Sequence, residues 1–272
     1  MWMRVISGLL LGAFVLGVIF FCQPWVMCVF LCLFSVIAVY EFLAATGFVK
    51  NRAMVIAAVA FSVLVVPWVY RGGGYESANI AVFLFAAFLF ALALGSARQV
   101  TLEQIGGAFF AAIFIPMAMS SFMRIRMMEN GIYLVLLPFV AACINDICAF
   151  FVGRKLGRTK MAPAISPKKT WEGSVGGLAG SVAGCFLYGV ILWYWGGFTI
   201  NWTVMVVIAL LGGAAGQFGD LCMSYIKREF GIKDYGNLIP GHGGILDRLD
   251  SLLFTAPVIE LIMLVAKKVL IG

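Results

Sequence analysis

Long apolar blocks dominate this sequence and exclude a water-soluble fold. Of its 272 residues, 63% are hydrophobic and only 11% are charged. A soluble domain is roughly half apolar and about a quarter charged, because its surface must face water. A helix needs about 20 consecutive, mostly apolar residues to cross a bilayer. The sequence therefore predicts an all-α, polytopic integral membrane protein that uses the lipid bilayer as its solvent.

Short polar stretches separate the apolar blocks into about nine predicted membrane-spanning helices. The first block lacks a small-residue cleavage pattern, so we expect it to remain as an uncleaved span. The predicted spans are residues 5–22, 25–43, 53–70, 78–95, 105–123, 132–152, 174–195, 203–219 and 251–266.

Basic residues are divided unequally between the two sides of this topology. With a cytoplasmic N-terminus, 14 of the 19 lysines and arginines fall in cytoplasmic segments and 5 on the opposite face. Because positive residues are retained on the cytoplasmic side, this split predicts a multi-pass protein of the cell membrane (the cytoplasmic or inner membrane) with an external C-terminus. The same asymmetry accounts for the net charge of +7, and we expect no nucleic-acid partner.

Polar residues are concentrated in the C-terminal half. The two long segments between predicted spans, 153–173 and 220–250, both lie on the predicted cytoplasmic side, and eight of the twelve acidic residues lie beyond residue 145. We therefore predict an N-terminal transmembrane scaffold of about five helices over residues 1–130. The chemistry is expected in a C-terminal transmembrane region over residues 131–272, which carries both long loops.

Three aspartates are predicted to meet at the cytoplasmic ends of the last two spans. Asp220 follows the eighth span, and Asp247 and Asp250 stand three residues apart where a helix is expected to begin. That spacing places two side chains on one helical face. Carboxylates suit a hard cation such as Mg²⁺. Four nearby cations would surround a polyphosphate: Lys227, Arg228, Lys233 and Arg248.

The alternative is that these charges form an ordinary solvated loop. The glycine-rich segment 240–244, which contains the only histidine, His242, is not typical of such a loop. Glycine lets a backbone approach a ligand closely. The sequence therefore favours a binding site.

A second polar segment begins inside the sixth predicted span. Asp146 lies about six residues before the end of that span, where an ionised carboxylate costs on the order of 2–3 kcal/mol and is by default a functional candidate. The alternative is a helix-packing hydrogen bond from the Asn145–Asp146 pair. Further along, Ser166, Lys168 and Lys169 supply a hydroxyl and two cations suited to a phosphate. Glu41, in contrast, is predicted to be unexceptional.

Residues 224–250 resemble the signature of phosphatidate cytidylyltransferases, also called CDP-diacylglycerol synthases. That pattern runs S-x-apolar-K-R, four residues, K-D, then a small residue and P-x-H-G-G-x-x-D-R-x-D. The resemblance extends over about 145–255, and the first 130 residues share only hydrophobic character. The matching positions are Ser224, Lys227, Arg228, Lys233, Asp234, Gly236, Pro240, His242, Gly243, Gly244, Asp247, Arg248 and Asp250.

The resemblance implies a Mg²⁺-dependent nucleotidyltransferase of phospholipid biosynthesis, which converts CTP and phosphatidate to CDP-diacylglycerol and pyrophosphate. A second metal or a monovalent cation stays open. The resemblance also implies a homodimer.

Roles for the matching residues follow as hypotheses. Asp220 and Asp247 would be primary metal ligands, and Asp250 and Asp146 further ligands or their supports. The phosphate-holding cations would be Lys168, Lys169, Lys227, Arg228 and Lys233, while His242 and Arg248 would contact nucleotide or lipid phosphates. The remaining predicted substrate-binding residues are Ser166, Ser224, Asp234, Gly243 and Gly244.

Other functions fit the sequence less well. A CTP-dependent lipid kinase shares the substrates and differs in which phosphorus it transfers. A CDP-alcohol phosphotransferase needs a D-G-x-x-A-R core, which the sequence lacks. A transporter predicts mid-membrane charges in broken helices and repeated halves, whereas here the charges gather at one interface.

Overall fold

The computed structural model describes residues 2–96, 100–238, 243–266 and 269–271, without the side chains of residues 2–11, 75, 270 and 271. The predictions for three signature-segment residues therefore lie outside the described residues: Pro240, Gly241 and His242. The same is true of three basic residues that contribute to the predicted membrane orientation: Arg98, Lys267 and Lys268. Contacts between Cα atoms divide the chain into two compact units. The first comprises Met1–Met127 and Phe230–Arg248, and the second comprises Met128–Glu229 and Leu249–Gly272.

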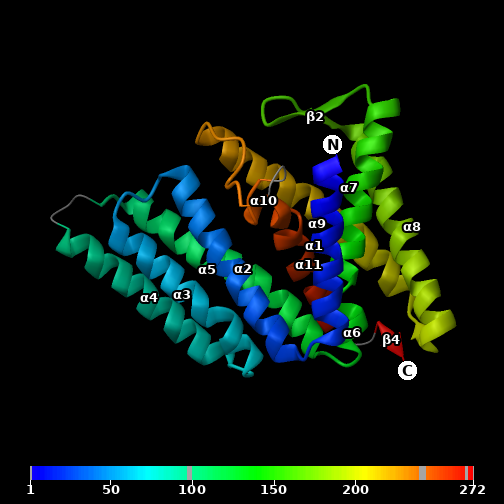
Figure 1. The fold of residues 1–272 in the computed structure, drawn as a ribbon, viewed down its shortest axis with the longest axis horizontal. Helices are drawn as coiled ribbons and strands as arrows, with labels where there is room; N and C mark the ends of the chain where they lie inside the picture. Colours follow the sequence, from blue (N-terminus) through cyan, green and yellow to red (C-terminus); the bar gives the residue numbers. More distant parts are fainter. Residues whose placement is uncertain (1, 97–99, 239–242, 267–268, 272) are drawn as a thin grey trace. The chain divides into compact units, whose positions relative to one another are not determined.

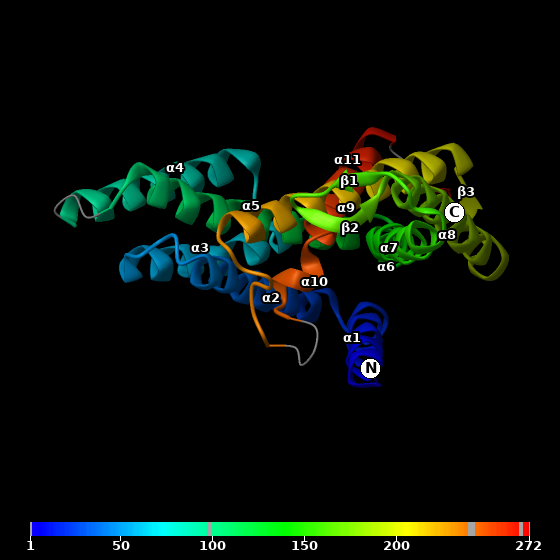
Figure 2. The same ribbon diagram turned by 90° about the horizontal axis from the view of Figure 1, so that it is seen from above.

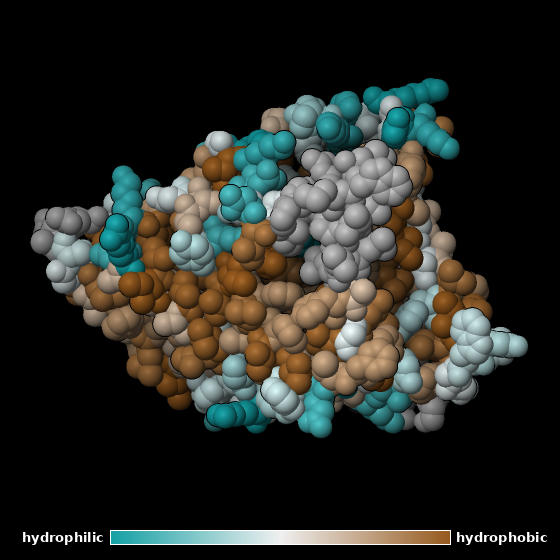
Figure 3. All heavy atoms as spheres, viewed as in Figure 1, coloured by the Kyte–Doolittle hydropathy of each residue, from teal (hydrophilic) through white to brown (hydrophobic). Residues whose placement is uncertain are grey.

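Within the described residues, eight helices are long and apolar enough to cross a membrane. The first predicted span, residues 5–22, corresponds to α1, Trp2–Phe21, whose described apolar part is Gly12–Phe21. Large apolar side chains such as Phe83 and Leu94 lie on the outside, 71% and 84% exposed. Figure 3 shows hydrophobic side chains over the flanks of the helices. The prediction of a polytopic α-helical membrane protein is confirmed.

The first unit is built from helices of the N-terminal half. Its helices after α1 are α2 Pro24–Thr46, α3 Arg52–Tyr70, α4 Tyr75–Gly95 and α5 Leu102–Met127. Helices α2, α3 and α5 pack against one another, and α4 packs on α5 and α3 (Figures 1 and 2). Local signals begin and end these helices, as at α2, where proline occupies the first turn and Gly47 takes a left-handed conformation with φ of 56°.

The second unit is a helical bundle with two short hairpins of strands. Helix α7 packs along α8, and α9 packs against α8, α7 and α11. Strands β1 and β2 pair antiparallel, as do β3 and β4. The elements are α6 Gly131–Leu134, α7 Leu137–Leu156, β1 Lys160–Ala162, β2 Ser166–Thr170, α8 Trp171–Gly196, β3 Thr199–Ile200, α9 Trp202–Glu229, α11 Leu252–Ala266 and β4 Leu270–Ile271.

Two predicted loops differ from the structure. The segment 153–173 contains the β1–β2 hairpin, and Thr170 then caps α8 by accepting a hydrogen bond from the Gly173 N–H at 3.1 Å. The eighth predicted span ends too early, because α9 continues to Glu229 with Lys227 and Arg228 in its last turn. Cations there complement the partial negative charge at a helix C-terminus. Asp220 therefore lies inside a helix, and the loop begins at residue 230.

The start of the ninth predicted span is also interrupted. Helix α10 covers only Leu246–Leu249, and α11 begins at Leu252. Asp247 lies in α10, whereas Asp250 lies in the turn between the two helices. The prediction that one continuous helix carries both carboxylates is therefore wrong.

Small residues set the contact between α7 and α8. A Cβ atom at Gly176, Gly180 or Gly184 of α8 would overlap side chains of α7, those of Val152, Cys148 and Ile144 respectively. Small residues repeated every four positions allow such close packing of helices in a membrane.

Replacing Gly180 with valine is expected to destabilise the second unit by about 1–3 kcal/mol, as is typical of overpacking. The added side chain would meet Cys148 and force α7 and α8 apart. Thermal unfolding in detergent measures the effect. Gly95→Ala is the control, because a Cβ at Gly95 meets no atom within 4 Å. Equal melting temperatures for the two variants would contradict the assigned helix contact.

Candidate active site

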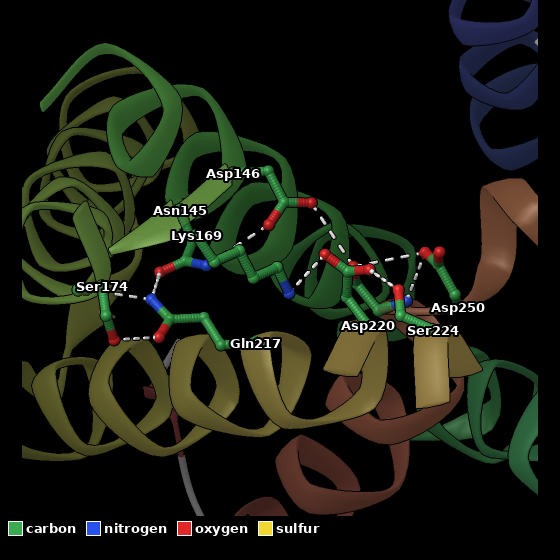
Figure 4. A network of polar contacts seen from close by, with 9 residues as sticks. Asn145, Asp146, Lys169, Ser174, Gln217, Asp220, Ser224 and Asp250 are labelled. Carbon is green, nitrogen blue, oxygen red and sulfur yellow. Dashed lines mark hydrogen bonds and ion pairs between the residues drawn. The ribbon is translucent and has the colours of Figure 1, made fainter. Parts of the chain in front are cut away.

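An ion pair between β2 and α9 forms the centre of the polar site in the second unit. The Nζ atom of Lys169 lies 2.6 Å from Oδ2 of Asp220, and the two side chains are 26% and 29% exposed. Figure 4 shows these side chains pointing toward each other. A half-buried pair is screened less by water and salt than a surface pair. Two residues predicted to bind phosphate and metal are thus in direct contact.

The hydroxyl of Ser224 supports the same aspartate from one turn further along α9. Its Oγ donates to Oδ1 of Asp220 at 3.2 Å. Each carboxylate oxygen of Asp220 therefore has a partner, which restricts the orientation of the carboxylate. Ser224, predicted to bind substrate, is thus in contact with a predicted metal ligand.

A second pair of carboxylates shares a serine. The Oγ atom of Ser251 lies 3.4 Å from Oδ2 of Asp146 on α7 and 3.4 Å from Oδ1 of Asp250. A hydroxyl has one hydrogen, so it can donate to only one of them at a time. Helix α9 can approach this turn because Gly219 has no side chain, and a Cβ there would lie 2.8 Å from the Asp250 carbonyl oxygen.

An amide network joins three helices beside these carboxylates. The side-chain nitrogen of Gln217 on α9 donates to Oδ1 of Asn145 at 2.8 Å and to the Ser174 carbonyl of α8 at 3.0 Å. The Ser174 hydroxyl donates back to Oε1 of Gln217. Asn145 in turn donates to Oδ1 of Asp146 at 3.4 Å. The network, drawn in Figure 4, orients α7, α8 and α9 at the level of Asp146.

Replacing Gln217 with leucine is expected to lower both stability and activity. The change leaves the fully buried Asn145 with its oxygen unsatisfied, which costs about 1–3 kcal/mol. Melting temperature and initial rate measure the two effects. Leu211→Ala on the same helix is the control, since its side chain is half exposed. A Gln217→Leu protein that matches wild type in both would exclude an orienting role for the network.

The β1–β2 hairpin is tied to the end of α9. The Nε atom of Arg228 donates to the Ile165 carbonyl oxygen at 3.3 Å. Lys168 on β2 is exposed, whereas Lys227 is buried at 8% exposure. The hairpin is labelled β2 in Figure 1. Four of the cations predicted to bind phosphates thus lie on the hairpin and on the last turn of α9: Lys168, Lys169, Lys227 and Arg228.

The rest of the predicted site lies in the first unit, in the loop of residues 230–245 that we call the signature loop, and in α10. Oδ2 of Asp247 accepts hydrogen bonds from the backbone N–H of Tyr235 at 2.8 Å and of Gly244 at 3.1 Å. Gly243 has a φ of 82°, a conformation that favours glycine. Among the predicted site residues in this part, Lys233, Asp234 and Arg248 have exposed side chains.

The polar site of the second unit offers carboxylate oxygens to a magnesium ion. Within the described residues, no group of three histidine, cysteine, aspartate or glutamate side chains is placed to hold a metal ion. Mg²⁺ does not need such a cage, because proteins usually bind it through one or two carboxylates, water and substrate phosphates. Asp220, Asp146 and Asp250 provide hard oxygen donors, so these residues fit that mode of binding.

Comparison with known proteins identifies the family. A family model described as the cytidylyltransferase family matches residues 2–266. The chain belongs to this family. A curated phosphatidate cytidylyltransferase of Bacillus subtilis (strain 168) is 34% identical over 189 residues, which are 69% of this chain and 68% of the relative.

Two further relatives match over shorter segments, and both are also named phosphatidate cytidylyltransferase. The protein of Brucella suis biovar 1 (strain 1330) is 44% identical over 131 residues, 48% of this chain and 47% of the relative. The protein of Staphylococcus haemolyticus (strain JCSC1435) is 36% identical over 136 residues, 50% and 51% of the two chains. The chain therefore spans about half the length of these two relatives.

Several polar residues of the site were missed by sequence reasoning. Ser251 bridges two carboxylates, and Gln217 and Ser174 form the amide network. The prediction that Glu41 is unexceptional is wrong, because its buried carboxylate accepts two backbone hydrogen bonds. The available signal was the same in each case: a polar side chain inside or beside an apolar block needs a partner.

Proposed function

We propose that this protein transfers the cytidylyl group of CTP to phosphatidate, which yields CDP-diacylglycerol and pyrophosphate. The observation that carries the proposal is the half-buried ion pair between Lys169 of the β1–β2 hairpin and Asp220 of α9, in a chain of the cytidylyltransferase family. The relatives named phosphatidate cytidylyltransferase suggest the substrates. A lipid substrate also gives a reason to build the site among membrane-spanning helices.

The proposed reaction depends more on cations that compensate phosphate charge than on a strong base. A phosphate oxygen of phosphatidate attacks the α-phosphorus of CTP, and the bond from that phosphorus to the bridging oxygen of the β-phosphate breaks. Pyrophosphate leaves with the bonding electrons. Since nucleophile and leaving group are both anionic, fixed cations that hold and orient the phosphates lower the barrier. This role would fall to Lys168 and Lys169 on the hairpin and to Arg228 on α9.

Magnesium is part of the proposal. Asp220 would hold it with Asp146 or Asp250, and Asp247 is the further ligand suggested by the signature. When bound, the ion would neutralise phosphate charge. Until a phosphate and a cation arrive, the contact with Lys169 compensates the charge of Asp220.

The membrane setting completes the proposal. A site on the cytoplasmic side of the cell membrane would give access to CTP, and the distribution of basic residues supports that orientation. A homodimer is suggested by the family resemblance. Cysteine labelling from each side of the membrane tests the orientation, and mass measurement in detergent tests the dimer.

Labelled CTP tests the reaction. Purified protein is incubated with phosphatidate, Mg²⁺ and CTP labelled at the α- or the γ-phosphorus. The proposal expects α-label in the lipid product, CDP-diacylglycerol, and γ-label in pyrophosphate. Transfer of the γ-label to lipid would instead identify a CTP-dependent lipid kinase. Uptake of an anionic solute into proteoliposomes without nucleotide would identify a transporter.

A further inference from the structure

Glu41 lies on α2, far from every motif in the sequence. Its carboxylate nevertheless accepts hydrogen bonds from the backbone at the end of the signature loop and the start of α10. Its side chain is buried, with 7% exposed. Oε1 accepts the backbone N–H of Ile245 at 3.1 Å, and Oε2 accepts the backbone N–H of Leu246 at 2.9 Å. Hydrogen bonds to an ionised acceptor are stronger than neutral ones, and burial protects them from competing water. Two strong contacts therefore join segments 204 and 205 residues apart in the chain.

Two glycines of the signature leave room for this carboxylate. A Cβ atom built on Gly236 or on Gly244 would overlap the carboxylate atoms of Glu41. Neither glycine has a positive φ, so backbone conformation does not require glycine at either position. Close packing against Glu41 is therefore a physical reason for a small residue at both signature positions.

The contacts of Glu41 continue into those of Asp247. Asp247 accepts the N–H groups of Tyr235 and Gly244, so the two carboxylates together bind four backbone N–H groups of the first unit. The ring of Tyr235 also stacks on Phe42, the residue after Glu41, with ring centroids 5.8 Å apart. The conformation around Asp247 thus depends on one short stretch of α2.

We propose that Glu41 is a positioning residue of the cytidylyl transfer site, which sets the conformation of Gly243, Gly244 and Asp247. This inference rests on the proposed function. A carboxylate is required, because both of its oxygens accept hydrogen bonds. Glutamine has nearly the same shape, but it offers one acceptor and places an NH₂ group against a backbone N–H.

Hydrogen–deuterium exchange tests the contact without using activity. In the Glu41→Gln protein, the amides of Ile245 and Leu246 are expected to exchange about tenfold faster or more, as the loss of a charge-assisted hydrogen bond implies. Peptides from α7 and α8 should keep their wild-type rates. Glu103→Gln is the matched control, since it makes the same chemical change at an exposed site of the first unit. Wild-type exchange at both amides would overturn the proposal.

Steady-state kinetics tests the link to the reaction. The Glu41→Gln enzyme is expected to show a kcat lower by about tenfold and a KM for CTP higher by about fivefold. A fall in the folded fraction lowers the apparent kcat and leaves KM unchanged, so the change in KM separates positioning from simple instability. Faster exchange with wild-type KM and kcat would refute the positioning role. A wild-type protein that performs no cytidylyl transfer would instead refute the proposed function. The exchange experiment would still test the Glu41 contact, because it does not depend on activity.

A double variant probes the glycine contact. Gly244→Ala alone is expected to lower the melting temperature, because its Cβ meets the Glu41 carboxylate. In a Glu41→Ala background the same change should cost much less, since the obstructing atoms are gone. Residues in contact show such non-additive effects, whereas distant ones usually add. Strict additivity would contradict the packing on which the proposal depends.

Discussion

Replacing Asp220 with asparagine is expected to lower kcat for cytidylyl transfer by about 10²–10³-fold, the typical cost of removing one preorganised charged group. The change keeps the shape of the side chain and the acceptor for Ser224, but it removes the negative charge beside Lys169. A half-buried cation would lose its partner, and the proposed Mg²⁺ ion would lose a ligand. Initial rates with CTP and phosphatidate measure the effect.

Glu229→Gln is the control for Asp220→Asn. It removes one negative charge from the exposed last turn of the same helix and should leave the rate near wild type. Melting temperatures of both variants show whether the protein remains folded. An Asp220→Asn enzyme with a near-normal rate would exclude Asp220 from the metal site and leave it as a structural partner of Lys169.

The second large effect is expected at Asp247, where two substitutions separate two roles. Asparagine keeps an oxygen that can accept hydrogen bonds from the N–H groups of Tyr235 and Gly244, so the Asp247→Asn protein should remain folded. If the carboxylate binds metal, the same protein should lose turnover. Alanine removes that acceptor and leaves two buried N–H groups, at about 1–3 kcal/mol each. The Asp247→Ala protein should therefore lose both stability and turnover.

Asn237→Ala, an exposed change in the same loop, is the control for both Asp247 substitutions. Melting temperature reports the loss of backbone contacts, and turnover reports the loss of charge. A stable Asp247→Asn protein with near wild-type turnover would restrict Asp247 to organising the signature loop. An Asp247→Ala protein as stable as wild type would refute that organising role.

Helix ends and strands were harder to predict than spans. Hydropathy located the apolar blocks, but it did not show that α9 continues through Asp220 to Glu229, because the polar last turns of a helix resemble a loop in a hydropathy pattern. The β1–β2 hairpin carries Lys168 and Lys169 in a segment with no clear two-residue alternation. Its strands depend on pairing with each other, which local sequence does not reveal.

The sequence by itself determined the class of fold and most of the candidate chemistry. Apolar blocks long enough to cross a bilayer require helices, because backbone polar groups in lipid must bond within their own segment. The spacing of the signature identified the aspartates and cations of the proposed site. These properties are local, so they can be inferred from short stretches of chain.

Only the tertiary structure decided which groups are partners. The contacts of Lys169 with Asp220, Gln217 with Asn145, and Glu41 with the amides of the signature loop join residues far apart in sequence. The physical reason is that a buried polar group is satisfied by whatever the fold brings within about 3 Å, and a one-dimensional pattern does not contain that distance. For this reason the role of Glu41, which belongs to no motif, could be inferred only from its hydrogen bonds to the backbone N–H groups of Ile245 and Leu246.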